Sequence, residues 1–316
     1  MKPVFWGLMS LVLFLGATQE CKADYIFTTL DVPGATSTGA SGINDLGQIV
    51  GGYSNPDTTV HGFLLSSGGY TTLDVPDGRT TNPRGINASG QIVGYYQSGI
   101  IPLRAFLLSE SIYTTLDAPG ATSTQALGIN DFGQIVGLYR DASFVSHGFL
   151  LSVAGYTTID VPGEAVTGAN AINNFRQIVG SYYSNSENFH GFLLSSGGYT
   201  TLDVPGALGT LPLGINDLGQ IVGTYSNDGP GPSRIHGFLL SDGGYTTIDV
   251  PGSTLTRAYG INNSGQIVGE YMDAGFKSHG FLATPVPEPS AALLLSIGLI
   301  AVLGYGWRRV DSKEKV

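Results

Sequence analysis

The sequence predicts an all-β fold, and within that class a six-bladed β-propeller built from six repeats of about 43 residues. The first observation behind this prediction is the composition, because the 316 residues include 47 Gly and 16 Pro and only 12% are charged. This mixture is too apolar for a disordered chain, and the Gly and Pro residues indicate frequent turns between short strands. The second observation is the repeat period, which is typical of a propeller blade and longer than that of most solenoid coils.

Three short strings recur in the copies of this repeat, which we number 1–6 along the chain. They are Tyr-Thr-Thr-Leu/Ile-Asp-Val/Ala-Pro, Gly-Ile-Asn-x-x-Gly-Gln-Ile-Val-Gly and His-Gly-Phe-Leu, with Arg104 in place of the histidine in copy 2. The repeated residues include Asp31, Asp74, Asp117, Asp160, Asp203 and Asp249, and His61, His147, His190, His236 and His279. Over residues 25–282 these strings resemble the HAF family of extracellular repeats, and that resemblance implies no biochemical activity.

Each copy contains four strand-like segments, which in copy 1 are residues 41–44, 48–53, 61–66 and 70–75. Ile49 and Val50 are both apolar although neighbouring residues of a strand face opposite sides, and this pattern predicts sheets that are buried on both faces. We expect Gly51 and its equivalents to lie where neighbouring sheets approach closely.

The two ends of the repeat region predict how the propeller closes. A strand-like segment at residues 27–32 precedes copy 1, whereas copy 6 stops after Leu282 and lacks its last strand. Pairing these segments would close a ring of six blades and remove its exposed edges. A β-solenoid is the alternative fold.

Residues 1–23 are predicted to be a secretory signal, because Lys2 precedes an apolar run at residues 4–16 and small residues follow it. We expect cleavage after Ala23, which leaves residues 24–285 as the propeller domain. The only cysteine, Cys21, then leaves with the signal. The mature chain would have no disulfide and no thiolate site.

The other end of the chain combines a short motif with an apolar segment. The motif residues are Val286, Pro287, Glu288 and Pro289, the apolar segment spans residues 291–307, and Arg308 and Arg309 follow it before the cytoplasmic tail predicted at residues 310–316. An apolar segment of this length can just cross a bilayer as a helix, and the arginines would keep the tail on the cytoplasmic side. An ordinary C-terminal anchor is one interpretation.

The arrangement at residues 286–309 also resembles the PEP-CTERM sorting signal of Gram-negative bacteria. This resemblance implies an exosortase-like processing enzyme as a partner. It further implies a transient anchor in the inner membrane, followed by delivery to the cell surface or the exterior.

The connections between the predicted strands separate into two groups. Residues 44–47 and 66–69 are uniform tight turns on one face, whereas residues 34–40, 54–60, 97–103, 163–168 and 226–235 vary and lie on the other face. Because recognition often resides in variable loops on a rigid frame, the variable face is the candidate binding face. One tyrosine per copy enters this face, where it could stack on a sugar ring or pack between blades: Tyr53, Tyr96, Tyr139, Tyr182, Tyr225 and Tyr271.

The five histidines are predicted to be structural, since one histidine per blade does not converge on a shared site. We expect each to bond within its blade, to the repeated Asp or Thr, which would resemble the Asp–His networks of WD-repeat propellers. The Asn-Asp-x-Gly turns lack the alternating oxygen ligands of a calcium loop. The sequence therefore predicts no metal and no cofactor.

Two function classes are consistent with these features. Residues 24–285 hold 8 Lys and Arg against 20 Asp and Glu, so a nucleic-acid partner is not expected. No motif for a catalytic centre is present either, which favours a non-catalytic surface or biofilm-matrix protein that binds exopolysaccharide or surface proteins. The alternative is an extracellular glycan-active enzyme that uses loop carboxylates, with Asp57, Asp141, Glu164, Glu187 and Asp228 as the candidates.

Overall fold

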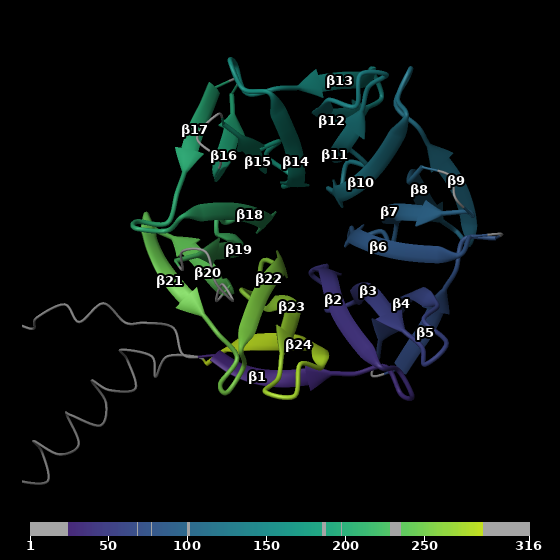
Figure 1. The fold of residues 1–316 in the computed structure, drawn as a ribbon, viewed down its shortest axis with the longest axis vertical. Helices are drawn as coiled ribbons and strands as arrows, with labels where there is room; N and C mark the ends of the chain where they lie inside the picture. The colour runs from purple at the N-terminus through teal and green to yellow at the C-terminus, as the bar shows by residue number, and fades with distance from the viewer. Residues whose placement is uncertain are drawn as a thin grey trace, which may run out of the picture. The chain divides into compact units, whose positions relative to one another are not determined.

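The computed structural model describes residues 25–286, except residues 68, 77, 100–101, 185–187, 197 and 228–234. The described residues form 24 strands and no helix, so they include no helix that could span a membrane. The strands are grouped in sheets around a central axis (Figure 1). The predicted all-β, propeller-like arrangement is thus confirmed. The predicted signal at residues 1–23, Pro287 and the rest of the sorting motif, the apolar segment and the tail lie outside the described residues.

The four strands of a copy follow one another directly along the chain. Copy 1 forms β2 (Ser37–Ile43), β3 (Ile49–Ser54), β4 (Val60–Ser66) and β5 (Gly69–Leu73), and copy 2 forms β6 (Thr80–Ile86), β7 (Ile92–Gln97), β8 (Arg104–Ser109) and β9 (Ile112–Leu116). Copy 3 forms β10 (Ser123–Ile129), β11 (Ile135–Arg140), β12 (Ser146–Ser152) and β13 (Gly155–Ile159). Copy 4 forms β14 (Val166–Ile172), β15 (Ile178–Tyr183), β16 (Phe189–Ser195) and β17 (Gly198–Leu202). Copy 5 forms β18 (Gly209–Ile215), β19 (Ile221–Ser226), β20 (Ile235–Ser241) and β21 (Gly244–Ile248). Copy 6 forms β22 (Leu255–Ile261), β23 (Ile267–Met272) and β24 (Ser278–Pro285), and β1 (Tyr25–Leu30) precedes all of them.

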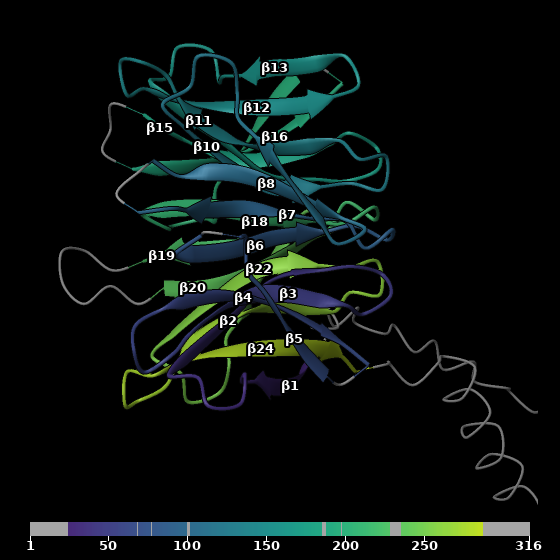
Figure 2. The ribbon, with the colours of Figure 1, turned by 90° about the vertical axis from the view of Figure 1, so that its right-hand side faces the viewer.

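The strands of each copy pair antiparallel in chain order. Copies 3, 4 and 5 each form a separate four-stranded sheet. Copies 1 and 2 share an eight-stranded sheet, in which a single parallel pair, Val60 with Thr80, joins their two sets of four strands. The first strand of each copy lies nearest the axis (Figure 1). Seen from the side, the strands run between two opposite faces, where the turns and loops lie (Figure 2).

The first strand of the chain completes the last sheet. β1 pairs antiparallel with β24, from Tyr25 opposite Pro285 to Leu30 opposite Gly280, and gives the strand order β1-β24-β23-β22. Phe27 of β1 also packs edge-on against Phe281, with ring centroids 5.8 Å apart. The predicted pairing of the first strand with copy 6 is therefore confirmed, and both ends of the repeat region lie in one sheet.

The core lies between neighbouring sheets. Ile49 is 3% exposed and Val50 is 0% exposed, so both faces of the copy 1 strands are buried, as their apolar pattern predicts. Val50 packs in one cluster with Ile86 and Phe106 of copy 2, and each of the other clusters likewise joins residues of adjacent copies. Burial of apolar surface between copies therefore holds the sheets side by side.

Two predictions about copy 1 need correction. β2 begins at Ser37 and not at residue 41, because its small residues, weak strand formers alone, pair with β3 and alternate between buried and half-buried. Gly51 makes a close approach within its own sheet, where a Cβ would lie 2.0 Å from the Gly39 carbonyl oxygen and 2.8 Å from the Phe63 ring. The close approach between sheets falls at Gly42, whose Cβ would lie 2.6 Å from the Arg84 carbonyl oxygen.

One buried asparagine per copy connects the sheets through its side-chain amide. Asn44 lies at the β2–β3 turn, is 5% exposed, and its Oδ1 accepts from the backbone N–H groups of Leu46 and Gln48. Its Nδ2 donates to Gln48 Oε1 at 2.8 Å and to the carbonyl oxygen of Asn87 in copy 2 at 3.0 Å. The same bond to the next copy is made in turn by Asn87, Asn130, Asn173, Asn216 and Asn262, and Asn262 donates back to Asn44. The amides thus form a closed ring.

A second ring of polar contacts lies one residue further along each turn, at Asp45, Ala88, Asp131, Asn174, Asp217 and Asn263. Asn174 Nδ2 bridges two carboxylates, with 2.8 Å to Asp131 Oδ2 and 2.9 Å to Asp217 Oδ2. Asn263 bridges Asp217 and Asp45 in the same way, at 3.1 and 2.7 Å. Ala88 occupies the third bridging position, between Asp131 and Asp45, and has no amide to donate.

We expect Ala88→Asn to stabilise the protein by about 1 kcal/mol, because the new amide would donate to the carboxylates at the two neighbouring positions of this ring, Asp45 and Asp131. Ala88→Asp is the matched control, since it has the same shape but adds a third negative charge. Thermal unfolding of the two variants and the parent protein measures the effect. An equal or lower unfolding temperature for Ala88→Asn than for Ala88→Asp would contradict the bridging interpretation.

Candidate functional site

Each predicted histidine contacts the aspartate of its own sheet. The distance from Nδ1 to the nearest carboxylate oxygen is 2.7–2.9 Å for the pairs His61–Asp74, His147–Asp160, His190–Asp203, His236–Asp249 and His279–Asp31. In the last pair the aspartate follows β1, so this contact also joins the two ends of the repeat region. The five pairs lie in different copies, and the structure does not bring them together.

The repeated tyrosines belong to the same clusters. Tyr53 lies opposite His61 in the β3–β4 ladder, and the two rings stack with centroids 5.3 Å apart. Its hydroxyl lies 3.0 Å from Thr72 Oγ1 on β5. The same stacking occurs at Tyr139, Tyr182, Tyr225 and Tyr271, and the same contact to threonine occurs at these four residues and at Tyr96. All six tyrosines are buried or half-buried, an arrangement that favours packing over an open ring of sugar-stacking surfaces.

Copy 2 keeps the contact although it lacks the histidine. Arg104 donates to Asp117 Oδ2 from Nε at 2.9 Å and from Nη2 at 2.5 Å. A hollow of about 330 Å³ lies beside this ion pair, between copies 2 and 3, and is also lined by Pro76, Leu103 and Thr124. The arginine thus preserves the link to the repeated aspartate.

Two of the candidate loop carboxylates hold their own loops in place. Asp57 Oδ1 accepts from both the backbone and the side chain of Thr59, and the side-chain bond is the main reason that the pKa of Asp57 is lowered. Asp141 accepts from the N–H groups of Val145 and Ser143, and these bonds lower its pKa as well. A lowered pKa is the opposite of what a general acid requires.

The other candidate carboxylates are not gathered into a described site. Glu164 follows β13 in a turn closed by its N–H bond to the Val161 carbonyl oxygen, whereas Glu187 and Asp228 lie outside the described residues. Within the described ranges, no group of three or more His, Cys, Asp or Glu side chains is arranged to hold a metal ion.

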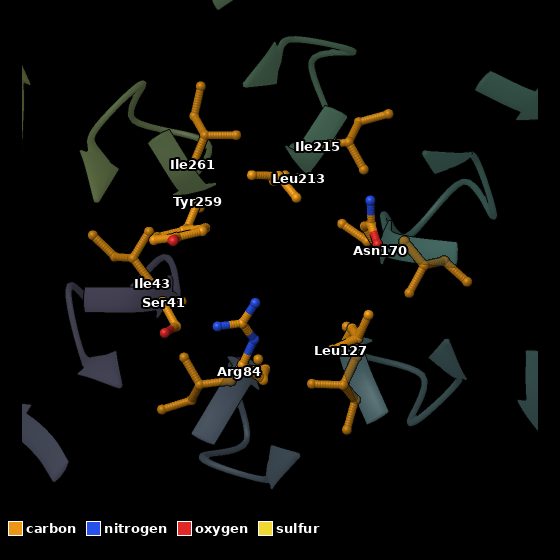
Figure 3. A pocket seen from close by; sticks show the side chains of 18 residues that line it. Ser41, Ile43, Arg84, Leu127, Asn170, Leu213, Ile215, Tyr259 and Ile261 are labelled. Carbon is orange, nitrogen blue, oxygen red and sulfur yellow. The ribbon is translucent and has the colours of Figure 1, made fainter. Parts of the chain in front are cut away.

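One residue per copy, at the same position of the innermost strand, lines the axis of the ring. The type of this residue differs between copies. The residues are Ser41, Arg84, Leu127, Asn170, Leu213 and Tyr259, and Figure 3 shows their side chains around one hollow. We call this space the axial hollow; its volume is about 100 Å³. The register of each innermost strand shifts at this position, for example between Ala40 and Gly42, so the residue belongs to a β-bulge. In copy 1, Ser41 alternates with its buried neighbour Ala40 as in a regular strand, and two buried residues in a row, Gly42 and Ile43, follow it.

Four charged or polar side chains of copies 2 and 6 form a connected cluster, and two of them, Arg84 and Tyr259, line the axial hollow. The Arg84 guanidinium lies over the Tyr259 ring, 5.4 Å from its centroid. Tyr259 donates its hydroxyl proton to Glu270 Oε1 at 3.0 Å, and Arg257 Nη1 donates to the same oxygen at 2.5 Å. Burial raises the pKa of Tyr259, which keeps the hydroxyl protonated as a donor. Arg257 therefore compensates the charge of Glu270.

A side pocket of about 210 Å³ adjoins the axial hollow and shares Ser41, Arg84 and Tyr259 with it. The space exists because copy 1 has Gly39 and Gly52 where copy 6 has Arg257 and Glu270. A Cβ on Gly39 would lie 3.1 Å from Glu270 Oε2, so this carboxylate oxygen faces the pocket. Residues of copies 1, 2 and 6 line the side pocket.

The sequence alone did not single out Arg84, Arg257, Tyr259 and Glu270. Motif searches follow residues that repeat, whereas these four residues occupy positions where the copies differ inside otherwise constant strands. A comparison of the copies position by position could have found them.

Comparisons with known proteins support the predicted sorting motif and the propeller-like fold. Residues 285–310 match the PEP-CTERM protein-sorting motif, so the predicted sorting motif is confirmed. No curated protein matches the chain in sequence.

Two fungal structures are similar in fold. The Aleuria aurantia lectin in complex with Fucalpha1-6GlcNAc superposes with a TM-score of 0.51 at 12% identity, over 81% of this chain and 98% of the lectin. AofleA from Arthrobotrys oligospora superposes with a TM-score of 0.51 at 12% identity, over 82% of this chain and 86% of that protein. At this identity the likeness concerns the fold, and it supports the propeller-like arrangement.

Because the histidine contacts are separate, we expect His147→Gln and His236→Gln each to destabilise the protein by roughly 1 kcal/mol, and the double variant to lose about the sum. Urea unfolding of the three variants measures this. Elemental analysis of the purified protein is the companion measurement. A stoichiometric transition metal that is lost in either single variant would show instead that the histidines share a site.

Proposed function

We propose that the chain is a non-catalytic, exported surface or matrix protein that binds a carbohydrate in the side pocket. In this proposal residues 1–23 are the export signal, residues 291–307 form a transient membrane anchor, and an exosortase-like enzyme processes the chain near Glu288. The eight-stranded sheet counts as two blades, which gives a propeller of six blades. The HAF-like repeats build that frame.

The observation that carries the binding proposal is the side pocket itself. It brings hydroxyl, amide, guanidinium and carboxylate groups together beside an aromatic ring, through Ser41, Asn82, Arg84, Tyr259 and Glu270. A pocket with several hydrogen-bonding groups and an aromatic surface suits a ligand that carries many hydroxyl groups. The fold likeness to a fungal lectin bound to a fucose-containing sugar adds support from a second direction.

The non-catalytic part of the proposal rests on the chemistry of the described carboxylates. Glu270 shares its Oε1 with Arg257 and Tyr259, and Asp57 and Asp141 are bound to their own loops. A glycoside hydrolase needs one carboxyl group with a raised pKa as its acid. The pKa values of Asp57 and Asp141 are lowered instead.

A glycan array probed with the purified protein tests the binding proposal. We expect selective binding to a set of oligosaccharides, and we expect Gly52→Leu to abolish it because the leucine would fill the side pocket. Copy 3 carries Leu138 at the equivalent position, so the frame accepts this side chain.

Ser181→Leu is the matched control, because it places the same side chain at the equivalent position of copy 4. Binding that is unchanged in Gly52→Leu would place the ligand elsewhere. A protein that binds no glycan would overturn the proposal.

The variant Glu288→Ala tests the proposed delivery of the protein to the surface or matrix, because it alters the sorting motif without changing a described strand. We expect the variant to remain in the membrane fraction, because the processing enzyme no longer recognises the motif, while its thermal unfolding stays unchanged. Immunoblots of the membrane and the medium measure the distribution. Normal release of the variant would show that the segment acts only as an anchor.

A further inference from the structure

We infer that Arg84 recognises a carboxylate, so that the carbohydrate bound in the side pocket is an acidic sugar of the uronic acid class. This inference rests on the proposed function and specifies its ligand. It concerns the one arginine that lines both the axial hollow and the side pocket.

The positive charge of Arg84 has no carboxylate partner among the described residues. Its side chain is half-buried, and within the described ranges it forms no ion pair, whereas Arg104 and Arg257 each pair with a carboxylate. Placing a guanidinium in a hollow without a counter-charge is unfavourable unless another group compensates it. The Tyr259 ring compensates it in part through a cation–π contact and holds it in position.

The charged side chains around the hollow carry one net positive charge. Arg257 and Glu270 neutralise each other, so the cluster keeps the single positive charge of Arg84. This positive site lies inside a protein whose net charge is −10. A ligand with one negative charge matches it, whereas a doubly charged phosphate would keep one negative charge without a partner.

The positions of Arg84 and Glu270 suit a ligand that carries both a carboxylate and a hydroxyl group. A guanidinium binds a carboxylate through two parallel hydrogen bonds, and Figure 3 shows the nitrogen atoms of Arg84 directed toward the axial hollow. Glu270 Oε2 faces the adjoining side pocket and is an acceptor suited to a sugar hydroxyl. A uronic acid unit carries a carboxylate and hydroxyl groups on one ring. The arrangement therefore fits such a unit better than a neutral sugar or a small anion.

Calorimetric titration tests the inference with three probes: an oligomer of galacturonic acid, the neutral galactose oligomer of equal length, and sodium sulfate. We expect the acidic oligomer to bind at least tenfold more tightly than the neutral one, since a charge-assisted bidentate contact contributes on the order of a tenfold to hundredfold gain in affinity. Higher salt should reduce this preference. Sulfate should bind weakly.

Three variants locate the effect. Arg84→Gln should remove the preference for the acidic oligomer, whereas Arg84→Lys should retain part of the preference because the charge remains. Arg140→Gln is the control, since it removes the same charge from an exposed residue of β11. Thermal unfolding of every variant verifies that it folds.

The outcomes separate the inference from the proposed function. A parent protein that binds neutral and acidic oligomers equally, that prefers sulfate, or that keeps its preference in Arg84→Gln would overturn the carboxylate inference while leaving carbohydrate binding in place. A parent protein that binds neither oligomer, and no glycan on the array, would overturn both.

Discussion

The side-chain amide of one asparagine per copy is the interaction on which the rest of the structure depends. Asn44 uses its oxygen for its own turn and divides its two N–H groups between its own copy and the next. A buried amide in such a position must have all its partners, so the distance between neighbouring sheets is confined to a narrow range. That distance in turn permits the contact of Gly42 with the Arg84 carbonyl and the packing of Val50 against copy 2. Since the last asparagine donates back to the first, each sheet is held from both sides.

The residues that repeat and the residues that could bind a ligand are different residues. The repeated His, Asp, Tyr and Thr side chains satisfy one another within each sheet and have little capacity left for a partner. The axial positions differ between copies, and one such side chain from each copy lines the axial hollow. Variation at these positions, and small residues such as Gly52, create an asymmetric pocket between copies 1, 2 and 6.

The sequence was sufficient to predict features that depend on periodic burial and on counting strands. The two-sided burial of Ile49 and Val50 and the pairing of the first strand with copy 6 are examples. It was not sufficient for β2, whose small residues become a strand only through their pairing with β3, nor for the contact partner of Gly51. The axial cluster was missed for a related reason. Ser41 and Arg84 differ although they occupy equivalent positions, and only the assembled sheets bring them to one hollow.

The pairing of β1 with β24 also sets the order of events during folding. Asp31 and His279, which meet beside these strands, are 248 residues apart in the chain, so bringing them together has a large entropic cost and depends on the sheets between them being formed first. Because β1 is the first strand of the chain, it has no partner strand until β24 is available. Glu288 follows Pro285 by three residues. Ring closure is then the final folding step, and it requires the strand that lies directly before the sorting motif.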